Sequence, residues 1–224
     1  MTYIPLDRED RTLKVGEFGT SKFKVNPVIV PVAPIETPTL APLYPIIWRS
    51  TSSGVELVAM TGLRPDHRYL ARRKPSELPL LIAAHPFSVQ DDGVSEKLTI
   101  LFDTDVVNED SAEAVIDDNG SLSANAERRC EALWAFVQSR RKAAPAFAAL
   151  AEAGVLLPWE PAFDTKRGSF SITGLLILDE AFFGSALHRE LIAKHGWHTA
   201  NVFVLHRISK HRITTLTADF SSHR

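Results

Sequence analysis

The sequence predicts an α+β fold, with a single compact domain, a mainly antiparallel sheet and a C-terminal helical half. Three observations predict it. The 224 residues are 45% hydrophobic and 23% charged, a composition typical of a globular chain that buries a sizeable core. Short runs rich in β-branched residues, separated by turn residues, occupy the first half. Apolar residues at helical spacing dominate after residue 123.

Composition along the chain predicts three regions. We expect residues 1–24, which are polar and contain two glycines, to form a flexible N-terminal arm. Residues 25–215 form the folded domain, and residues 216–224 form a C-terminal tail. Within the domain, residues 25–45 carry prolines at positions 27, 31, 34, 38, 42 and 45. Proline fixes φ and lacks an N–H donor, so we expect an extended strap held against the core by its aliphatic residues, without helix or central strand.

The elements before residue 123 follow from local patterns. Residues 45–49 and 55–61 read as two strands joined by a turn, and residues 69–71 read as a further short strand. Ser76 is a suitable N-cap for a short helix over residues 77–84. Residues 97–102 predict a strand, and an acidic loop over residues 103–118 follows it.

The second half is predicted to be richer in helix. A stripe of residues at helical spacing starts a helix near Ser123, Pro145 is expected to start a second helix, and Gly154 ends it. Residues 170–178 read as a strand, and residues 185–195 as a helix closed by Gly196. Residues 197–213 fit a strand or a helix, and we favour the helix. The stripe of the first helix consists of Ala126, Cys130, Leu133, Trp134 and Val137.

Charge and cysteine content indicate the compartment. The net charge is −2 and the pI is near 6.4, so neither nucleic acid nor an anionic membrane is predicted as a partner. A single cysteine, Cys130, excludes an internal disulfide and fits a cytoplasmic protein. No secretory signal or membrane span is predicted, because residues 1–11 are polar and the apolar runs are short. We therefore expect a soluble, cytoplasmic chain.

The usual catalytic and metal-binding patterns are absent from the sequence. The histidines crowded between residues 188 and 211 lack the spacing of a zinc site, and the acidic segment does not match an EF-hand. There is no Ser-centred nucleophile elbow and no phosphate-binding glycine loop. We therefore predict no metal and no cofactor, and we favour a protein that is not an enzyme.

Weak candidates for a site remain. His85, His206 and Asp103 are polar residues in apolar surroundings, where perturbed pKa values can mark catalytic groups. The densest positive run supplies binding candidates or, on the simpler interpretation, a solvated face. We expect Trp48, Trp134, Trp159 and Trp197 to lie in the core. The binding candidates are Arg68, Arg72, Arg73 and Lys74.

Several segments, in a shared order, resemble the bacterial SapC family. They are Tyr44-Pro45-Ile46-Ile47, Val58 to Leu63, His85-Pro86-Phe87 where the family has Tyr-Pro-Phe, Leu98 to Asp103, Asp117 to Gly120, Leu156-Leu157-Pro158, Gly174 to Glu180, and Gly196 to Ser209. The resemblance covers residues 25–213. It implies no established catalytic residue, and Trp197-His198 departs from the leucines that the family prefers.

The resemblance implies a role beside other proteins. The family is named after a protein linked with a bacterial surface layer, and its members commonly occur beside TonB-dependent receptors, flavin-dependent halogenase-like proteins and cupin-like oxygenases. We therefore expect a non-enzymatic accessory or binding protein that has a protein partner or forms a homo-oligomer, with a small peptide or amino acid as an alternative ligand. The alternative is an unrecognised enzyme with a His/carboxylate pocket, metal-dependent or not.

Overall fold

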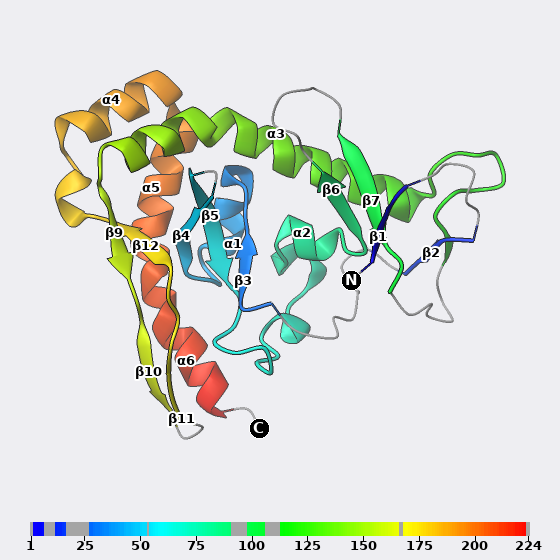
Figure 1. Ribbon diagram of the computed structural model, residues 1–224, viewed down its shortest axis with the longest axis horizontal. Coiled ribbons are helices and arrows are strands. Elements are labelled where there is room, and N and C mark those ends of the chain that lie inside the picture. Colours follow the sequence, from blue (N-terminus) through cyan, green and yellow to red (C-terminus); the bar gives the residue numbers. More distant parts are fainter. Residues whose placement is uncertain are drawn as a thin grey trace. The chain divides into compact units, whose positions relative to one another are not determined.

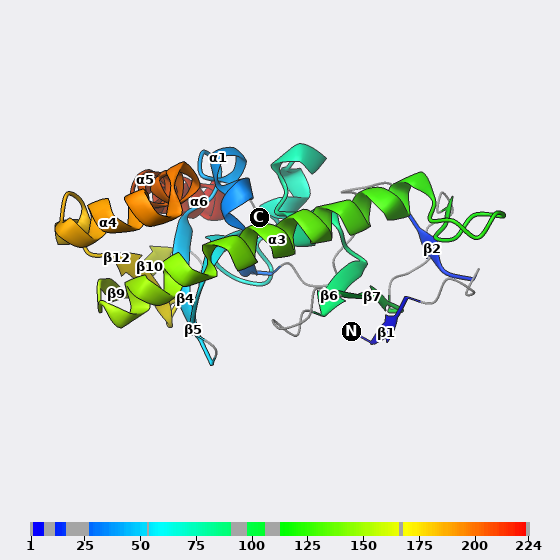
Figure 2. The same cartoon turned by 90° about the horizontal axis from the view of Figure 1, so that it is seen from above.

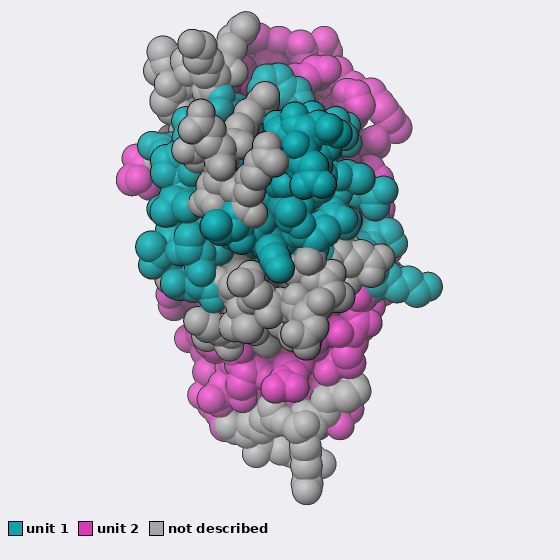
Figure 3. All heavy atoms as spheres, turned by 90° about the vertical axis from the view of Figure 1, so that its right-hand side faces the viewer, with its two compact units in different colours: residues 1–24, 74–138 teal, residues 25–73, 139–224 magenta. Residues whose placement is uncertain are grey.

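The computed structural model describes residues 2–6, 12–16, 27–52, 54–90, 98–105, 113–165 and 168–222. Figure 1 shows its helices and strands, and Figure 2 shows them from above. The chain forms two compact units (Figure 3), and each combines segments that are far apart in the sequence. Unit 1 comprises residues 1–24 and 74–138, and unit 2 comprises residues 25–73 and 139–224. The strand pairs of the described residues are antiparallel, which confirms the predicted α+β class.

Unit 1 contains a small sheet that packs with the first half of a long helix. The sheet has the strand order β1-β7-β6, and a second pair joins β2 to β8. Phe87 and Phe102 meet edge to face in its core, with ring centroids 5.3 Å apart. The elements are β1 (Tyr3–Pro5), β2 (Lys14–Val15), η3 (Pro75–Glu77), α2 (Leu80–Ala83), β6 (Phe87–Gln90), β7 (Thr99–Asp103), β8 (Glu113–Ala114) and the start of α3 (Ala124–Glu152).

Unit 2 is built on a five-stranded sheet of order β3-β5-β4-β12-β9. Its two edge strands each contain a proline, Pro31 in β3 and Pro158 in β9. A proline lacks the N–H that an edge would offer to another strand, so it protects both edges from further pairing. The strands of unit 2 are β3 (Ile29–Pro31), β4 (Ile46–Thr51), β5 (Gly54–Met60), β9 (Leu156–Trp159) and β12 (Leu175–Leu178), with the hairpin of β10 (Ala162–Thr165) and β11 (Gly168–Ser171).

The helices of unit 2 come mainly from the C-terminal region. Helix α5 packs against β4 and α1, and its buried side includes Val202, Phe203 and His206. Trp48 of β4 is fully buried, and its ring lies edge-on to Phe147, 4.4 Å away. The helical elements are η1 (Pro34–Glu36), α1 (Thr37–Leu40), η2 (Leu70–Arg72), η4 (Glu180–Phe182), α4 (Ala186–His195), α5 (Trp197–Ser209), η5 (Lys210–Arg212) and α6 (Ile213–Ser222).

Several predicted elements are confirmed. The hairpin of β4 and β5 lies where the two strands were expected, and β7 matches the predicted strand at 97–102. Helix α4 begins after Ser185, whose hydroxyl accepts a hydrogen bond from the His188 N–H, and ends at Gly196 with φ 76°. That conformation favours glycine. The helix favoured over a strand for residues 197–213 is also present, as α5 and η5.

The prediction of a strap without helix is wrong. Residues 34–40 form η1 and α1, each with a proline in its first turn. A proline is tolerated there because the first N–H groups of a helix have no partner within the helix. The expectation that the strap packs onto the core is confirmed, since Val30, Val32 and Leu40 are buried.

Three other local predictions are wrong. Pro145 lies inside the continuous, 29-residue helix α3 and does not start a second helix. Where a strand was expected over residues 69–71, the structure has the 3-10 helix η2 (Leu70–Arg72), with Tyr69 as its N-cap. The strand expected over residues 170–178 is divided into β11 and β12, because Gly174 takes φ 76° between them. Gly154 ends α3 as predicted, with φ 66°.

The regions predicted as an N-terminal arm and a C-terminal tail contain strands and helix where the structure describes them. In the predicted arm, β1 pairs with β7 and β2 pairs with β8. The predicted tail includes most of α6, where Leu216 and Phe220 are buried. In the described part of the chain, none of the helices combines the length and apolar character that a bilayer crossing requires.

Candidate functional site

Two of the three predicted catalytic candidates meet in unit 1. His85 lies just before β6 and Asp103 ends β7, and the pairing of these strands brings the two together. The His85 Nε2 atom is 3.4 Å from the Asp103 Oδ2 atom. Both residues are buried, and the Asp103 N–H donates to the Pro86 carbonyl at 2.9 Å. The other carboxylate oxygen, Oδ1, accepts from the Asp105 N–H at 3.1 Å.

The surroundings of this pair keep the imidazole neutral. Burial lowers the pKa of His85, the hydrogen bond to Asp103 opposes that shift, and the Arg129 cation adds to it. Burial, and then the charge of Asp103, raise the pKa of Tyr3, which faces Asp103 across β1 and β7. A neutral imidazole beside a carboxylate is chemically able to accept a proton, as a general base does.

Arg129 of α3 is a fully buried cation in unit 1. Its guanidinium donates to three backbone carbonyls, those of His85 at 3.3 Å, Asn125 at 3.2 Å and Gly16 at 3.1 Å. Burial lowers the pKa of Arg129 to about 10, so the group stays charged at neutral pH. Arg129 therefore holds the backbone at His85 in place. No sequence pattern indicated this role.

The third catalytic candidate, His206, belongs to the core of unit 2. Its Nδ1–H donates to the Ile46 carbonyl at 2.8 Å, and its Nε2 accepts from the Leu178 N–H at 3.2 Å. Burial lowers the pKa of His206 to about 4. With both nitrogens bound to backbone and 1% of its surface exposed, this side chain joins α5 to β4 and β12 and has no atom left for a substrate.

Two of the four predicted binding residues have partners within unit 2. Arg72 pairs with Asp219 of α6, and the Arg73 guanidinium lies 4.1 Å from the centroid of the Tyr69 ring. Arg68 is exposed. Lys74 belongs to unit 1, where its backbone N–H donates to Glu77 at 3.1 Å. Half of this set is therefore engaged within unit 2.

The acidic segment over residues 103–118 is the other part of the chain that is rich in possible ion ligands. Asp117 accepts hydrogen bonds from the N–H groups of Asn119 and Ser121, which confirms the tight turn predicted there. Glu109 and Asp110 lie outside the described residues. Across the residues that are described, no group of three or more His, Cys, Asp or Glu side chains is arranged to hold a metal ion.

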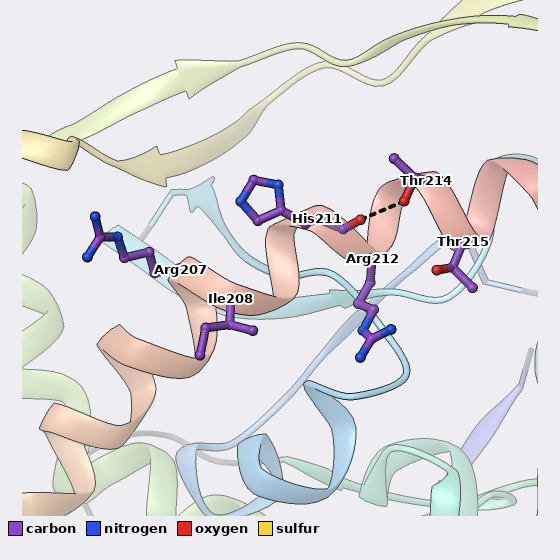
Figure 4. Close-up of a pocket in the computed structure, with 6 residues that line it drawn as sticks. All are labelled: Arg207, Ile208, His211, Arg212, Thr214 and Thr215. Carbon is purple, nitrogen blue, oxygen red and sulfur yellow. Dashed lines mark hydrogen bonds between the residues drawn. The ribbon is translucent and has the colours of Figure 1, made fainter.

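A different surface, on the outer side of α5, emerges from the structure. Trp197, Val204 and Ile208 are 72%, 49% and 59% exposed, and their spacing places them on one stripe of the helix. We call these three residues together with Arg212 the α5 face. An open depression of about 590 Å³ lies at its C-terminal end, and Figure 4 shows Ile208 and Arg212 extending to the same side of the helical run. The depression is lined by Arg207, Ile208, His211, Arg212, Thr214 and Thr215.

Sequence reasoning missed this surface because both sides of α5 carry apolar residues. The prediction that Trp197 and Trp134 are core residues is wrong, since they are 72% and 49% exposed. The prediction is confirmed for Trp48. A helix that is apolar on all sides is usually buried on all sides. Helix α5 is an exception, because its outer apolar stripe is exposed.

Comparison with known proteins identifies the family and nothing narrower. No curated protein matches the chain, and no solved structure matches it. The model of the SapC family matches residues 7–216. That range includes most of both units and all of the α5 face. The match covers most of the chain, and the chain therefore belongs to the SapC family.

Proposed function

We propose that this chain is a non-enzymatic accessory protein that binds another protein through the α5 face. The observation that carries the proposal is the exposure of Trp197, Val204 and Ile208 on one stripe of a helix whose other side is core. Burying a large apolar side chain contributes about 1.5–3 kcal/mol. Three such residues along one stripe of a helix, one of them aromatic, are typical of a protein interface.

The family setting supports a protein as the partner. Proteins that the sequence resembles commonly occur beside TonB-dependent receptors and flavin-dependent halogenase-like proteins, and we propose a cell-surface protein, a receptor of the first kind or a halogenase-like protein as the partner.

The test is site-specific photo-cross-linking in the cells that express the chain. A benzophenone amino acid replaces Val204 in one variant and Ile35 of η1 in a matched control, since Ile35 is 58% exposed and is not one of the residues of the α5 face. We expect a discrete adduct at position 204 and none at position 35. Excess wild-type protein without the photo-reactive residue should compete for the partner and suppress the adduct, whereas an equal excess of the Ile208→Asp variant should not. No adduct at 204, or the same adduct at both positions, contradicts the proposal.

One observation favours the enzymatic alternative. The buried His85 and Asp103 side chains lie 3.4 Å apart, as a general base and its orienting carboxylate do. Replacing a catalytic pair commonly leaves stability unchanged or raises it, because active sites are not optimised for stability. Replacing a structural pair lowers it.

Thermal unfolding of His85→Asn and Asp103→Asn variants separates the two roles. The accessory-protein proposal expects each variant to lose about 1–3 kcal/mol of stability, since a buried hydrogen-bonding group is left without its partner. An unchanged or raised Tm in both variants favours the enzyme, while loss of stability in both favours the structural role.

A further inference from the structure

The sequence stretch that contains α5 has no acidic residue. Between Glu190 and Asp219 the sequence contains no Asp or Glu, while Lys and Arg occur four times and His four times. In a protein whose net charge is −2, a stretch of this length with only positive or neutral groups is a marked local excess. The cations in this stretch are Lys194, Arg207, Lys210 and Arg212.

Neutralisation from elsewhere in unit 2 is partial. Glu180 of η4 pairs with Arg207 at 2.9 Å and with Lys210 at 2.5 Å, so one carboxylate serves two cations. Arg212 forms no ion pair with a carboxylate among the described residues. The C-terminal end of the α5 face is therefore net positive.

The apolar and positive parts of the surface are continuous. Trp197 and Ile208 are eleven residues apart, which corresponds to about 16 Å along an α-helix. Arg212 follows Ile208 by one turn, and the two side chains extend to the same side in Figure 4. The surface therefore presents an apolar track about three turns long that ends at a cation.

From this arrangement we infer that the partner presents an acidic amphipathic helix to the α5 face, an inference that rests on the proposed function. Apolar residues at helical spacing on the partner pack against Trp197, Val204 and Ile208, and carboxylates near one end meet Arg212. Helix-in-groove recognition uses this combination of an apolar stripe for affinity and charge for orientation.

Two other occupants fit less well. A second copy of the chain would bring one stretch without carboxylates against another, so like charges would meet, with Glu180 the one paired carboxylate on each side. An anionic membrane favours a helix with a broad apolar side, whereas the exposed apolar track of α5 is a single stripe. Asn201, which is part-exposed, interrupts this stripe between Trp197 and Val204.

The experiment uses the full-length chain and a displayed library of 18-residue helical peptides that hold leucine at every third or fourth position and vary all other positions among Glu, Lys, Gln and Ala. Selection on the wild-type chain, with counter-selection on the Ile208→Asp variant, is expected to enrich peptides rich in Glu. Affinity of a selected peptide should fall at least tenfold for Ile208→Asp and for Arg212→Glu. It should stay within twofold for Ile35→Asp, since Ile35 is as exposed as Ile208 but is not part of the α5 face.

Other results overturn the inference. These are enrichment of neutral or Lys-rich peptides, enrichment of none, and binding that ignores Arg212→Glu. Concentration-dependent dimers that Ile208→Asp abolishes, or binding to vesicles with 30% anionic lipid that the same change abolishes, would assign the α5 face to a second copy or to a membrane. The cross-linking experiment is independent: an adduct at position 204 with a partner that lacks an acidic helix keeps the proposed function and removes only this inference.

Discussion

His206 illustrates how a residue that resembles a catalytic group is a structural one. Its two ring nitrogens bind the backbone of β4 and β12, one as donor and one as acceptor. That arrangement requires the neutral imidazole with its proton on Nδ1. Protonation would place a second hydrogen on Nε2, against the Leu178 N–H. The buried side chain therefore stabilises the fold only while it is neutral.

The pH dependence of stability tests this account of His206. Burial lowers its pKa from 6.5 to about 4, so the unfolded chain binds the proton more tightly. The stabilisation is complete above pH 6.5 and is lost as the pH falls toward 4, an effect of about 3 kcal/mol. In urea titrations, the free energy of unfolding of wild type should exceed that of His206→Gln at pH 7, and the difference should shrink by about that amount at pH 4. A constant difference contradicts the account.

At the scale of elements, local signals succeed where they coincide with packing. The β4–β5 hairpin is predictable from the turn residues between its strands, and α4 from Ser185 and Gly196 at its ends. Each of these signals acts within a few residues. Strand β9 is not predictable, because Pro158 argues against a strand unless that strand is known to be an edge. Helix α1 is not predictable either, because Pro38 argues against a helix unless it is known to lie in the first turn.

The candidate site was predictable only as a set of residues. His85 and Asp103 stand out from their apolar neighbours in the sequence. Their contact depends on the pairing of β6 with β7, and no local pattern at these two residues indicates that pairing. The α5 face was not predictable, because Val202 and Phe203 on one side of the helix are as apolar as Val204 and Ile208 on the other. Only the packing shows which side is covered.

Helix α3 offers a prediction at the same scale. Pro145 is exposed in its interior, and a proline there removes one helical hydrogen bond and crowds the preceding turn at a cost of about 3 kcal/mol. Buried neighbours such as Phe147 and Leu150 keep the helix continuous. Pro145→Ala should therefore raise the free energy of unfolding by about 2 kcal/mol, since part of the gain is offset by greater freedom of the unfolded chain.

Chemical denaturation measures this change, and the reverse substitution in the same helix is its control. Ala148 is also exposed, so Ala148→Pro should lower the free energy of unfolding by about 3 kcal/mol. If Pro145→Ala instead destabilises the chain, α3 depends on the proline, as the prediction of two separate helices assumed.

At the scale of the whole molecule, the chain leaves unit 2 at residue 73 and returns to it at residue 139. The two segments of unit 2 must therefore be held together by contacts between residues distant in sequence. One such contact joins His67 to Asp219 of α6, with 2.8 Å between Nε2 and Oδ2. The His67 Nδ1 accepts from the Leu63 N–H at 3.2 Å, and the His67 ring centroid lies 5.0 Å from that of Phe220. Helix α6 is in this way part of the folded unit.

A double-mutant cycle on this contact tests whether it couples the two segments. Burial lowers the pKa of His67, and Asp219 opposes that shift. In Asp219→Asn the pKa of His67 should therefore fall further, as an NMR titration of the ring protons shows. The variants His67→Gln and Asp219→Asn should have a coupling energy of about 1–2 kcal/mol in urea denaturation, whereas Ser221→Ala, on the exposed side of α6, should be neutral. Because Arg72 shares the carboxylate of Asp219, a coupling near zero would show that Arg72 alone holds α6, and that the contact with His67 adds no cohesion to unit 2.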